Sequence, residues 1–513
     1  MTEQKESSIS EEQLHVLIRG GTRAALASQI ASQIASLVVL AILYRLLRPA
    51  DYGLFGMALP AVMLPRMAAT LGVGAAIVQS PELSPGQRTS LFWLMQALGL
   101  TAALITAACG VLLSWAYHQP MVLWLSLALA GSTLLATGGQ THQSLLERQL
   151  AFGPLAAARL VAQLIGGIAA IGAALRGWGV WSLVTQQTVE LALAAALAWR
   201  LEPWRPARPA QGEPLGSLVS FSGYFAATNL VFYVAQNVEK LLFPWLLGSS
   251  AQVAIGLFSQ AMSFVLRIVY LVTAALSGVM LPALSRAKDN PPLYAELVAR
   301  FFRLTGVVLL PAGVGLFFVA PELMLLLGGY NWQQAGAILR ALAPLLLVQG
   351  LLNLTGSIFG SLGQGRRLLA GSLVYTALLA LGLVAGWLCA TWLFPAARSG
   401  TVQWVTLCMA TSYTLTTLVV IFIPYTAFCL RSARVSLSAS LLPLLPALHG
   451  ALLMGLCVWL ADWVLRLATG VGDMSRLTVL IILGVACYLL FAGREVRWLA
   501  SELFGAPVPP DER

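Results

Sequence analysis

Charged residues are scarce in this chain, and their scarcity excludes a water-soluble protein. Asp, Glu, Lys and Arg make up 10% of the 513 residues, whereas 58% are hydrophobic. A typical soluble domain carries about 25% charged residues. Because a soluble fold of this length must cover its surface with polar groups, we expect most of the chain to lie in a bilayer. Each crossing needs roughly 20 apolar residues.

Motifs for catalysis and metal binding are also lacking. The four histidines form no HExxH pattern, the six cysteines form no CxxC pair, and no GxxxxGK[ST] phosphate loop occurs. We therefore expect no metal site, no cofactor, no ATPase and no enzymatic activity, and expect a proton or sodium gradient to supply the energy. A membrane-embedded glycosyltransferase would need a long external loop with carboxylates, and every predicted loop is short.

Long apolar runs are abundant, and they predict an all-α polytopic membrane protein with 14 transmembrane helices. The first run is too long for the apolar core of a signal peptide, so we expect it to be retained. A proline-rich stretch at 203–214 predicts a linker between two halves. The predicted helix centres are residues 35, 66, 102, 132, 164, 190, 232, 267, 312, 349, 380, 415, 452 and 484.

The distribution of basic residues predicts the orientation. If the helices alternate, nineteen of the 30 Lys and Arg residues lie on the side of the N-terminus and seven lie on the opposite side. The excess of basic residues in cytoplasmic loops then places both termini in the cytoplasm. The formal charge of +10 is explained in this way without a nucleic-acid partner. A cluster near the middle of the chain predicts contact with anionic lipids: Arg286, Lys288, Arg300 and Arg303.

Two short segments recur in both halves of the chain. Gly53-Leu54-Phe55 recurs as Gly256-Leu257-Phe258, 203 positions later. A second pattern consists of a Thr-Gly pair with an arginine eleven positions after the threonine. It occurs once as Thr137 with Arg148 and again as Thr355 with Arg366. A repeat of about six helices predicts two pseudo-symmetric six-helix lobes with the same orientation, plus two C-terminal helices. The predicted division is 1–202, a linker at 203–216, 217–430, and 431–513.

Six charged residues fall inside predicted spans: Arg66, Arg159, Glu190, Glu239, Lys240 and Arg267. Charges at membrane depth are costly, so they usually face a cavity or a partner. Because basic side chains bind phosphate oxygens strongly, the four cations are predicted to bind an anionic substrate. Glu190 and Glu239 are predicted either to couple an ion or to pair with these cations. Arg148 and Arg366, at predicted cytoplasmic helix ends, are candidates for first contact with a diphosphate head group, or they simply set topology.

Several stretches resemble the polysaccharide-exporter branch, the Wzx-type flippases, of the multidrug/oligosaccharidyl-lipid/polysaccharide exporter (MOP) superfamily. They cover roughly residues 20–430. In the second half, Phe243-Pro244-Trp245 departs from the Gly-basic pair usual in relatives. The resembling stretches are Asp51–Phe55, Gly72–Gln79, Ser90–Trp93, Leu145–Phe152, Gly177–Val184, Asn237–Leu242, Leu281–Arg286 and Gly329–Trp332.

The resemblance implies an alternating-access carrier that moves an undecaprenyl-diphosphate-linked oligosaccharide across the bacterial inner membrane. It also implies partners among polysaccharide polymerases and chain-length proteins. Two other functions stay open. A lipid II flippase would share the fourteen-helix plan and a cationic cavity, whereas a MATE-like drug/cation antiporter would favour buried carboxylates in the first span, which has none.

Overall fold

The computed structural model describes residues 32–80, 83–208, 230–231, 233–393, 402–467 and 472–504. Every regular element in these ranges is helical, and ten helices are long and apolar enough to cross a membrane. Ser32–Leu46 and Leu345–Ser361 form shorter apolar helices. The expected all-α, multi-pass class is therefore confirmed. The predicted centre at residue 232 lies outside the described residues, and the other thirteen centres fall within helices.

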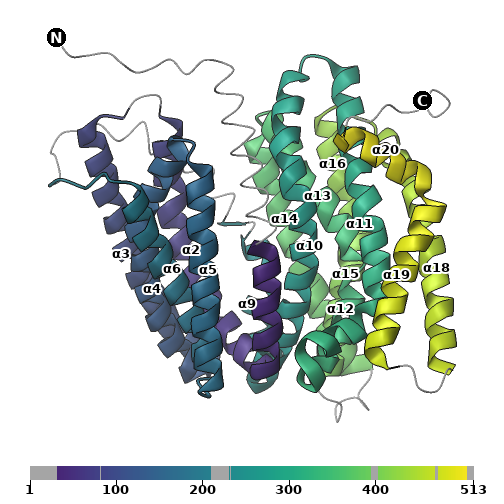
Figure 1. Ribbon diagram of the computed structural model, residues 1–513, viewed down its shortest axis with the longest axis horizontal. Helices are drawn as coiled ribbons and strands as arrows, with labels where there is room; N and C mark the ends of the chain where they lie inside the picture. The colour runs from purple at the N-terminus through teal and green to yellow at the C-terminus, as the bar shows by residue number, and fades with distance from the viewer. Residues whose placement is uncertain are drawn as a thin grey trace. The chain divides into compact units, whose positions relative to one another are not determined.

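The chain divides into two compact units (Figure 1). Unit 1 comprises Met1–Leu47 and Ala58–Leu230, and unit 2 comprises Arg48–Met57 and Val231–Arg513. Of the predicted linker at 203–216, the structure describes residues 203–208, and the rest lies outside the described residues.

In unit 1, the described helices form a bundle whose long axes run side by side (Figure 1). Packing is closest between α3 and α4, between α4 and α6, and between α5 and α6. Small residues permit this closeness, since a Cβ atom on Gly139 of α4 would lie 2.5 Å from the Ala195 Cα of α6. The helices are α2 (Pro49–Gln79), α3 (Pro85–Ala116), α4 (Pro120–Arg148), α5 (Phe152–Leu175) and α6 (Trp181–Leu201).

Unit 2 is built around α10 and α11, which contact most of its other helices. Its first helices are α9 (Val238–Leu247), α10 (Ala251–Arg286), α11 (Pro291–Gly328), α12 (Gln333–Leu342), α13 (Leu345–Ser361) and α14 (Gly365–Leu388). They are followed by α15 (Val402–Leu415), a π-helical turn (Thr416–Ile421), α16 (Phe422–Ser432), α17 (Leu437–Leu441), α18 (Leu445–Leu467), α19 (Asp473–Phe491) and α20 (Gly493–Phe504). The two C-terminal spans pack on each other and on α11.

Helix α2 belongs to both units, because its first nine residues are part of unit 2. Within unit 2 this segment crosses α10 with backbone against backbone. A Cβ atom on Gly53 would overlap the carbonyl oxygen of Gln252, and one on Gly256 would overlap that of Pro49. The contact is reciprocal, since Pro49 and Gln252 are separated by the same 203 positions as the two glycines. The recurring Gly-Leu-Phe segments of the two halves therefore meet at this crossing.

A charge cluster, buried except for Arg466, joins α18 and α19 to α11. The Asp462 carboxylate accepts hydrogen bonds from Arg476 Nε at 2.7 Å and from Arg466 Nε at 2.9 Å. Glu322 Oε1 of α11 lies 3.1 Å from Arg476 Nη2 and 3.6 Å from Arg466 Nη2. Two carboxylates and two guanidinium groups thus balance each other. Arg466 and Arg476, which the sequence places in external loops, lie in the last turn of α18 and the first turns of α19.

Replacing Asp462 with alanine should lower the free energy of unfolding by about 2–4 kcal/mol, because removing one partner leaves buried charges uncompensated. The measurement is the thermal unfolding of the purified protein in detergent. Asp473, an exposed carboxylate in the first turn of α19, is the matched control. Equal shifts for Asp462→Ala and Asp473→Ala would show that the cluster contributes nothing to the attachment of these helices.

Candidate functional site

Arg66 lies near the middle of α2, and it is half-buried in unit 1. Its Nη2 atom donates to Met63 Sδ at 2.8 Å. Glu190 of α6 interacts electrostatically with Arg66. Gly166 of α5 allows α6 to approach, since a Cβ atom there would lie 3.0 Å from Glu190 Cβ. Unit 1 therefore brings together one predicted substrate-binding cation and one predicted ion-coupling carboxylate.

Arg159 has a different environment. Its Nη2 atom forms a salt bridge with Glu147 Oε1 at 2.8 Å and donates to Gln143 Oε1 at 3.2 Å. The Arg159 side chain is 53% exposed. Glu190 is thus within electrostatic range of Arg66, whereas Arg159 pairs with a carboxylate at the end of α4.

In unit 2, Glu239 and Lys240 lie in the first turn of α9 and face different partners. Glu239 is 3% exposed and accepts a hydrogen bond from Ser259 Oγ of α10 at 3.3 Å. Lys240 Nζ donates to Asn237 Oδ1, and a Cβ atom on Gly56 would lie 3.9 Å from Lys240 Cε. Arg267 is half-buried near the middle of α10.

Arg66 and Arg267 occupy corresponding places in the two units. Arg66 lies 17 residues after the start of α2, and Arg267 lies 16 residues after the start of α10. At 1.5 Å per residue, Arg66 lies about 20 Å along its helix from Gly53, and Arg267 lies about 17 Å along its helix from Gly256. Each unit therefore carries one half-buried guanidinium group at a similar distance from this crossing.

Unit 2 also contains a network of uncharged polar side chains. This network was not predicted from the sequence, because only charged residues at membrane depth were considered as candidates. Tyr375 Oη donates to Gln349 Oε1 at 3.3 Å, and Asn353 Nδ2 donates to Thr273 Oγ1 at 3.5 Å. A cavity of about 30 Å³, enough for roughly one water molecule, lies among these groups. Its polar lining is Gln236, Gln349, Asn353, Ser372, Tyr375 and Tyr425.

Arg148 and Arg366, the repeated arginines of the Thr-Gly pattern, have unlike surroundings. Arg148 Nη1 donates to the carbonyl oxygen of Ile77 at 3.2 Å and to that of Ser80, so it holds the last turn of α2. Arg366 is exposed in the first turn of α14. Arg148 thus satisfies helix-terminal carbonyl groups that would otherwise lack partners.

A second unpredicted feature is an aromatic cluster that holds residues 202–207 against unit 1. The rings of His142 and Trp199 stack at 4.1 Å, and His142 Nε2 lies 3.2 Å from the carbonyl oxygen of Trp204. Phe92 contacts all three rings edge to face. The beginning of the predicted linker is therefore anchored to unit 1 through Trp204, although Pro203, Arg205 and Ala207 are exposed.

Two of the four cations predicted to contact anionic lipids bind the C-terminal helix α20. Arg303 forms two hydrogen bonds with Glu495, at 2.8 and 2.9 Å, and lies 4.1 Å from the ring centre of Trp498. Arg300 pairs with Glu502. Arg286 and Lys288 remain exposed.

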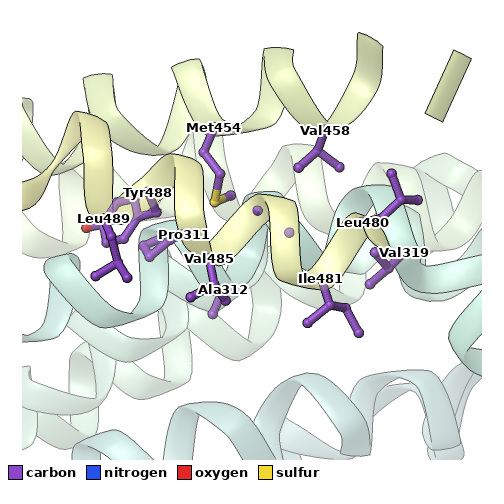
Figure 2. Close-up of a pocket in the computed structure, with 12 residues that line it drawn as sticks. Pro311, Ala312, Val319, Met454, Val458, Leu480, Ile481, Val485, Tyr488 and Leu489 are labelled. Atoms are coloured by element: carbon purple, nitrogen blue, oxygen red, sulfur yellow. The ribbon is translucent and has the colours of Figure 1, made fainter. Parts of the chain in front are cut away.

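An apolar groove of about 310 Å³ lies between α11, α18 and α19 (Figure 2). Met454 and Val458 extend into it from α18, and Ile481 and Val485 line it from α19 (Figure 2). The Tyr488 hydroxyl donates to the carbonyl oxygen of Val307 at 2.8 Å, so the one polar side chain of the lining is satisfied. Such a surface suits a hydrocarbon chain.

The family of the chain follows from a family-level comparison. A family model described as polysaccharide biosynthesis protein matches residues 42–337, which is more than half of the chain. The chain therefore belongs to this family, and the resemblance to polysaccharide exporters is confirmed.

Individual relatives agree with this assignment. The chain is 24% identical over 341 residues to the teichuronic acid biosynthesis protein TuaB of Bacillus subtilis, covering 65% of this chain and 68% of that protein. It is 25% identical over 366 residues to the succinoglycan biosynthesis transport protein ExoT of Rhizobium meliloti, covering 69% and 73%. It is 22% identical over 351 residues to the lipopolysaccharide biosynthesis protein WzxC of Escherichia coli, covering 67% and 69%.

Solved structures support the fold. The lipid II flippase MurJ in an inward closed conformation superposes with a TM-score of 0.70 at 13% identity, over 93% of this chain and 99% of that one. An inward-facing multidrug resistance MATE transporter of the MOP superfamily gives a TM-score of 0.62 at 11% identity, over 79% and 95%. The chain is thus a multi-pass membrane protein of the polysaccharide biosynthesis protein family, with the fold of these transporters.

Proposed function

We propose that this chain flips an undecaprenyl-diphosphate-linked oligosaccharide repeat unit across the bacterial inner membrane, for exopolysaccharide, capsule or O-antigen synthesis. The observation that carries the proposal is the pair Arg66 and Arg267, one in the middle of a long apolar helix in each unit. A guanidinium group can donate two parallel hydrogen bonds to the oxygens of one phosphate group, and the low dielectric constant of the membrane interior strengthens that interaction. A lipid diphosphate at membrane depth needs such groups.

The apolar groove on α11, α18 and α19 supports the lipid-linked part of the proposal. It offers an uncharged surface within unit 2 for an isoprenoid chain. Substrates without a long hydrocarbon chain would gain little from it, because its contribution comes from burying apolar surface. In this proposal the chain crosses the membrane fourteen times, as two six-helix lobes and two C-terminal helices, with both termini in the cytoplasm.

Alternating access driven by a proton or sodium gradient completes the proposal. Glu190 and Glu239 are the candidate coupling groups, because one interacts with Arg66 and the other is buried and accepts a hydrogen bond from Ser259. A group that exchanges a cation next to the substrate site can favour one conformation over the other. The polysaccharide polymerase and chain-length proteins are the proposed partners.

Transport of lipid II is the second candidate, favoured by the high TM-score with MurJ. The two are distinguished by complementation. Expression in strains that lack a polysaccharide flippase should restore surface glycan for at least one defined repeat unit. Expression in a strain depleted of its lipid II flippase should leave growth arrested. Rescue of the second strain alone would contradict the proposal and favour peptidoglycan precursor transport.

A further inference from the structure

A second apolar groove lies on unit 2, between α14 and the segment formed by the π-helical turn and α16. Its volume is about 350 Å³. Gly371 forms part of one wall, and a Cβ atom there would lie 2.9 Å from Tyr425 Cε2, so the helices are close at its base. The lining is Ala370, Gly371, Val374, Tyr375, Leu378, Val420, Ile421, Pro424, Tyr425 and Phe428.

The walls of this groove are open to the outside of unit 2. Val374 is 59% exposed, Val420 is 47% exposed and Phe428 is 41% exposed. In a membrane-spanning segment, exposed aliphatic and aromatic walls face lipid. The occupant is therefore a molecule that arrives from the bilayer rather than from water.

Four arginines stand at one end of the same groove. Arg366 and Arg367 lie in the first turn of α14, one turn before Ala370 and Gly371. Arg431 lies in the last turn of α16, about one turn after Phe428, and Arg434 follows directly. All four are exposed. Gln364 Nε2 donates to the carbonyl oxygen of Ser432 at 3.4 Å, which brings these two helix ends together.

Among the described residues, no carboxylate forms a salt bridge with these arginines. The sequence contains no Asp or Glu between Glu322 and Asp462. Within the part of the chain that the structure describes, the salt bridges of unit 2 involve α11, α18, α19 and α20, and none involves these four arginines. By contrast, Arg300 and Arg303 on α11 are matched by glutamates of α20. Among the described residues, the arginines at this groove thus differ from Arg300 and Arg303 in having no salt bridge to a carboxylate.

The backbone also favours a role for the last of these arginines. Arg434 has φ of 58°, in the left-handed region where glycine is the usual residue. A residue with a side chain is disfavoured there by roughly 1–2 kcal/mol. Arg434 thus holds a turn position that the backbone would favour for glycine, three positions after Arg431.

We infer that this groove binds an anionic phospholipid, with one acyl chain between α14 and α16 and the phosphate on the four arginines. Basic pockets between transmembrane helices bind the head groups of cardiolipin and related lipids. Under the proposed orientation the arginines face the cytoplasm, where anionic head groups attract basic residues. The inference does not depend on which substrate is transported, because it concerns a lipid of the surrounding bilayer.

The test is lipid retention by the full-length protein, measured by native mass spectrometry after delipidation and addition of cardiolipin or phosphatidylcholine. The wild type should retain cardiolipin in preference to phosphatidylcholine. The quadruple variant Arg366→Gln, Arg367→Gln, Arg431→Gln, Arg434→Gln should bind cardiolipin about a hundredfold more weakly. The variant Ala370→Trp, which fills the groove at an exposed position, should weaken cardiolipin binding while leaving the arginines intact.

A matched control removes two exposed arginines of α20, Arg494→Gln and Arg497→Gln, and should bind cardiolipin as the wild type does. Thermal unfolding gives a second readout, because a bound lipid stabilises the folded state. Cardiolipin should raise the unfolding temperature of the wild type and the control but not of the quadruple variant. Equal cardiolipin binding by the quadruple variant would overturn the inference. A second outcome would also overturn it: the wild type binds undecaprenyl phosphate more tightly than cardiolipin, and the quadruple variant loses that binding. The groove would then bind the transported substrate rather than a lipid of the bilayer.

Discussion

Gly53→Ala and Gly256→Ala should each abolish glycan export and destabilise unit 2. At both positions an added Cβ atom would overlap a main-chain carbonyl oxygen of the crossing helix. A backbone contact cannot be relieved by a change of rotamer, so the helices must separate along their crossing. We expect a loss of about 3 kcal/mol or more in the free energy of unfolding, at the upper end of the usual cost of overpacking. Thermal unfolding and export in a flippase-deficient strain are the measurements.

Gly278→Ala is the matched control, because Gly278 lies in the same helix α10 and an added Cβ atom would meet nothing within 4 Å. It should be neutral or slightly stabilising, since alanine favours a helix more than glycine does. In the double variant Gly53→Ala, Gly256→Ala, the loss in free energy of unfolding should be smaller than the sum of the two single losses. Both substitutions force apart the same helix crossing, so the second adds little once the helices have separated. Normal stability and export in both single variants would show that the crossing is not a tight contact.

Arg66→Ala and Arg267→Ala should each reduce export at least about tenfold, and their combination should abolish it. A hydrogen bond to a charged group contributes about 1.5–3 kcal/mol, which is a tenfold to hundredfold change in affinity. Arg66→Lys and Arg267→Lys should retain part of the export, because lysine keeps the charge but loses the planar fork. The measurement is surface glycan per molecule of membrane-inserted protein, and the amount of protein should not change.

The pairing of Arg66 with Glu190 offers a sharper test. If Arg66 serves only to neutralise Glu190, then the double variant Arg66→Gln, Glu190→Gln should restore export that Arg66→Gln abolishes. If Arg66 binds the diphosphate, the double variant should stay inactive. Arg176→Ala, which removes an exposed arginine after α5, is the control and should export normally.

The helices of this fold were predictable because the membrane imposes a simple rule. A span must be apolar over its length, and the centres from residue 66 to residue 190 and from residue 267 to residue 484 all fall in helices. The Gly-Leu-Phe repeat was also visible, but its meaning was not. Gly53 lies against the backbone of Gln252, and Gly256 lies against that of Pro49. This contact is a property of the packing of α2 on α10, and it cannot be read from the spacing within either segment.

The roles of individual charges were less predictable, because a hydropathy pattern gives depth and not direction. Arg148 was placed correctly at a helix end, yet its partners are carbonyl groups about 70 positions earlier in the chain. Glu322 was not singled out, and its cations lie more than 140 positions away. The polar network around Tyr375 contains no formal charge, so a search for costly buried charges could not find it.

The course of α2 has a consequence for any attempt to divide the protein into two fragments. Its first nine residues complete unit 2, although they precede nearly all of unit 1 in the chain. If the gene were divided within the 209–229 segment, the second fragment would contain unit 2 without residues 48–57, which would be encoded in the first fragment. That fragment would have to recruit the missing helical turns from the first. In the single chain this exchange is permanent, because α2 continues without a break from its unit 2 segment into unit 1.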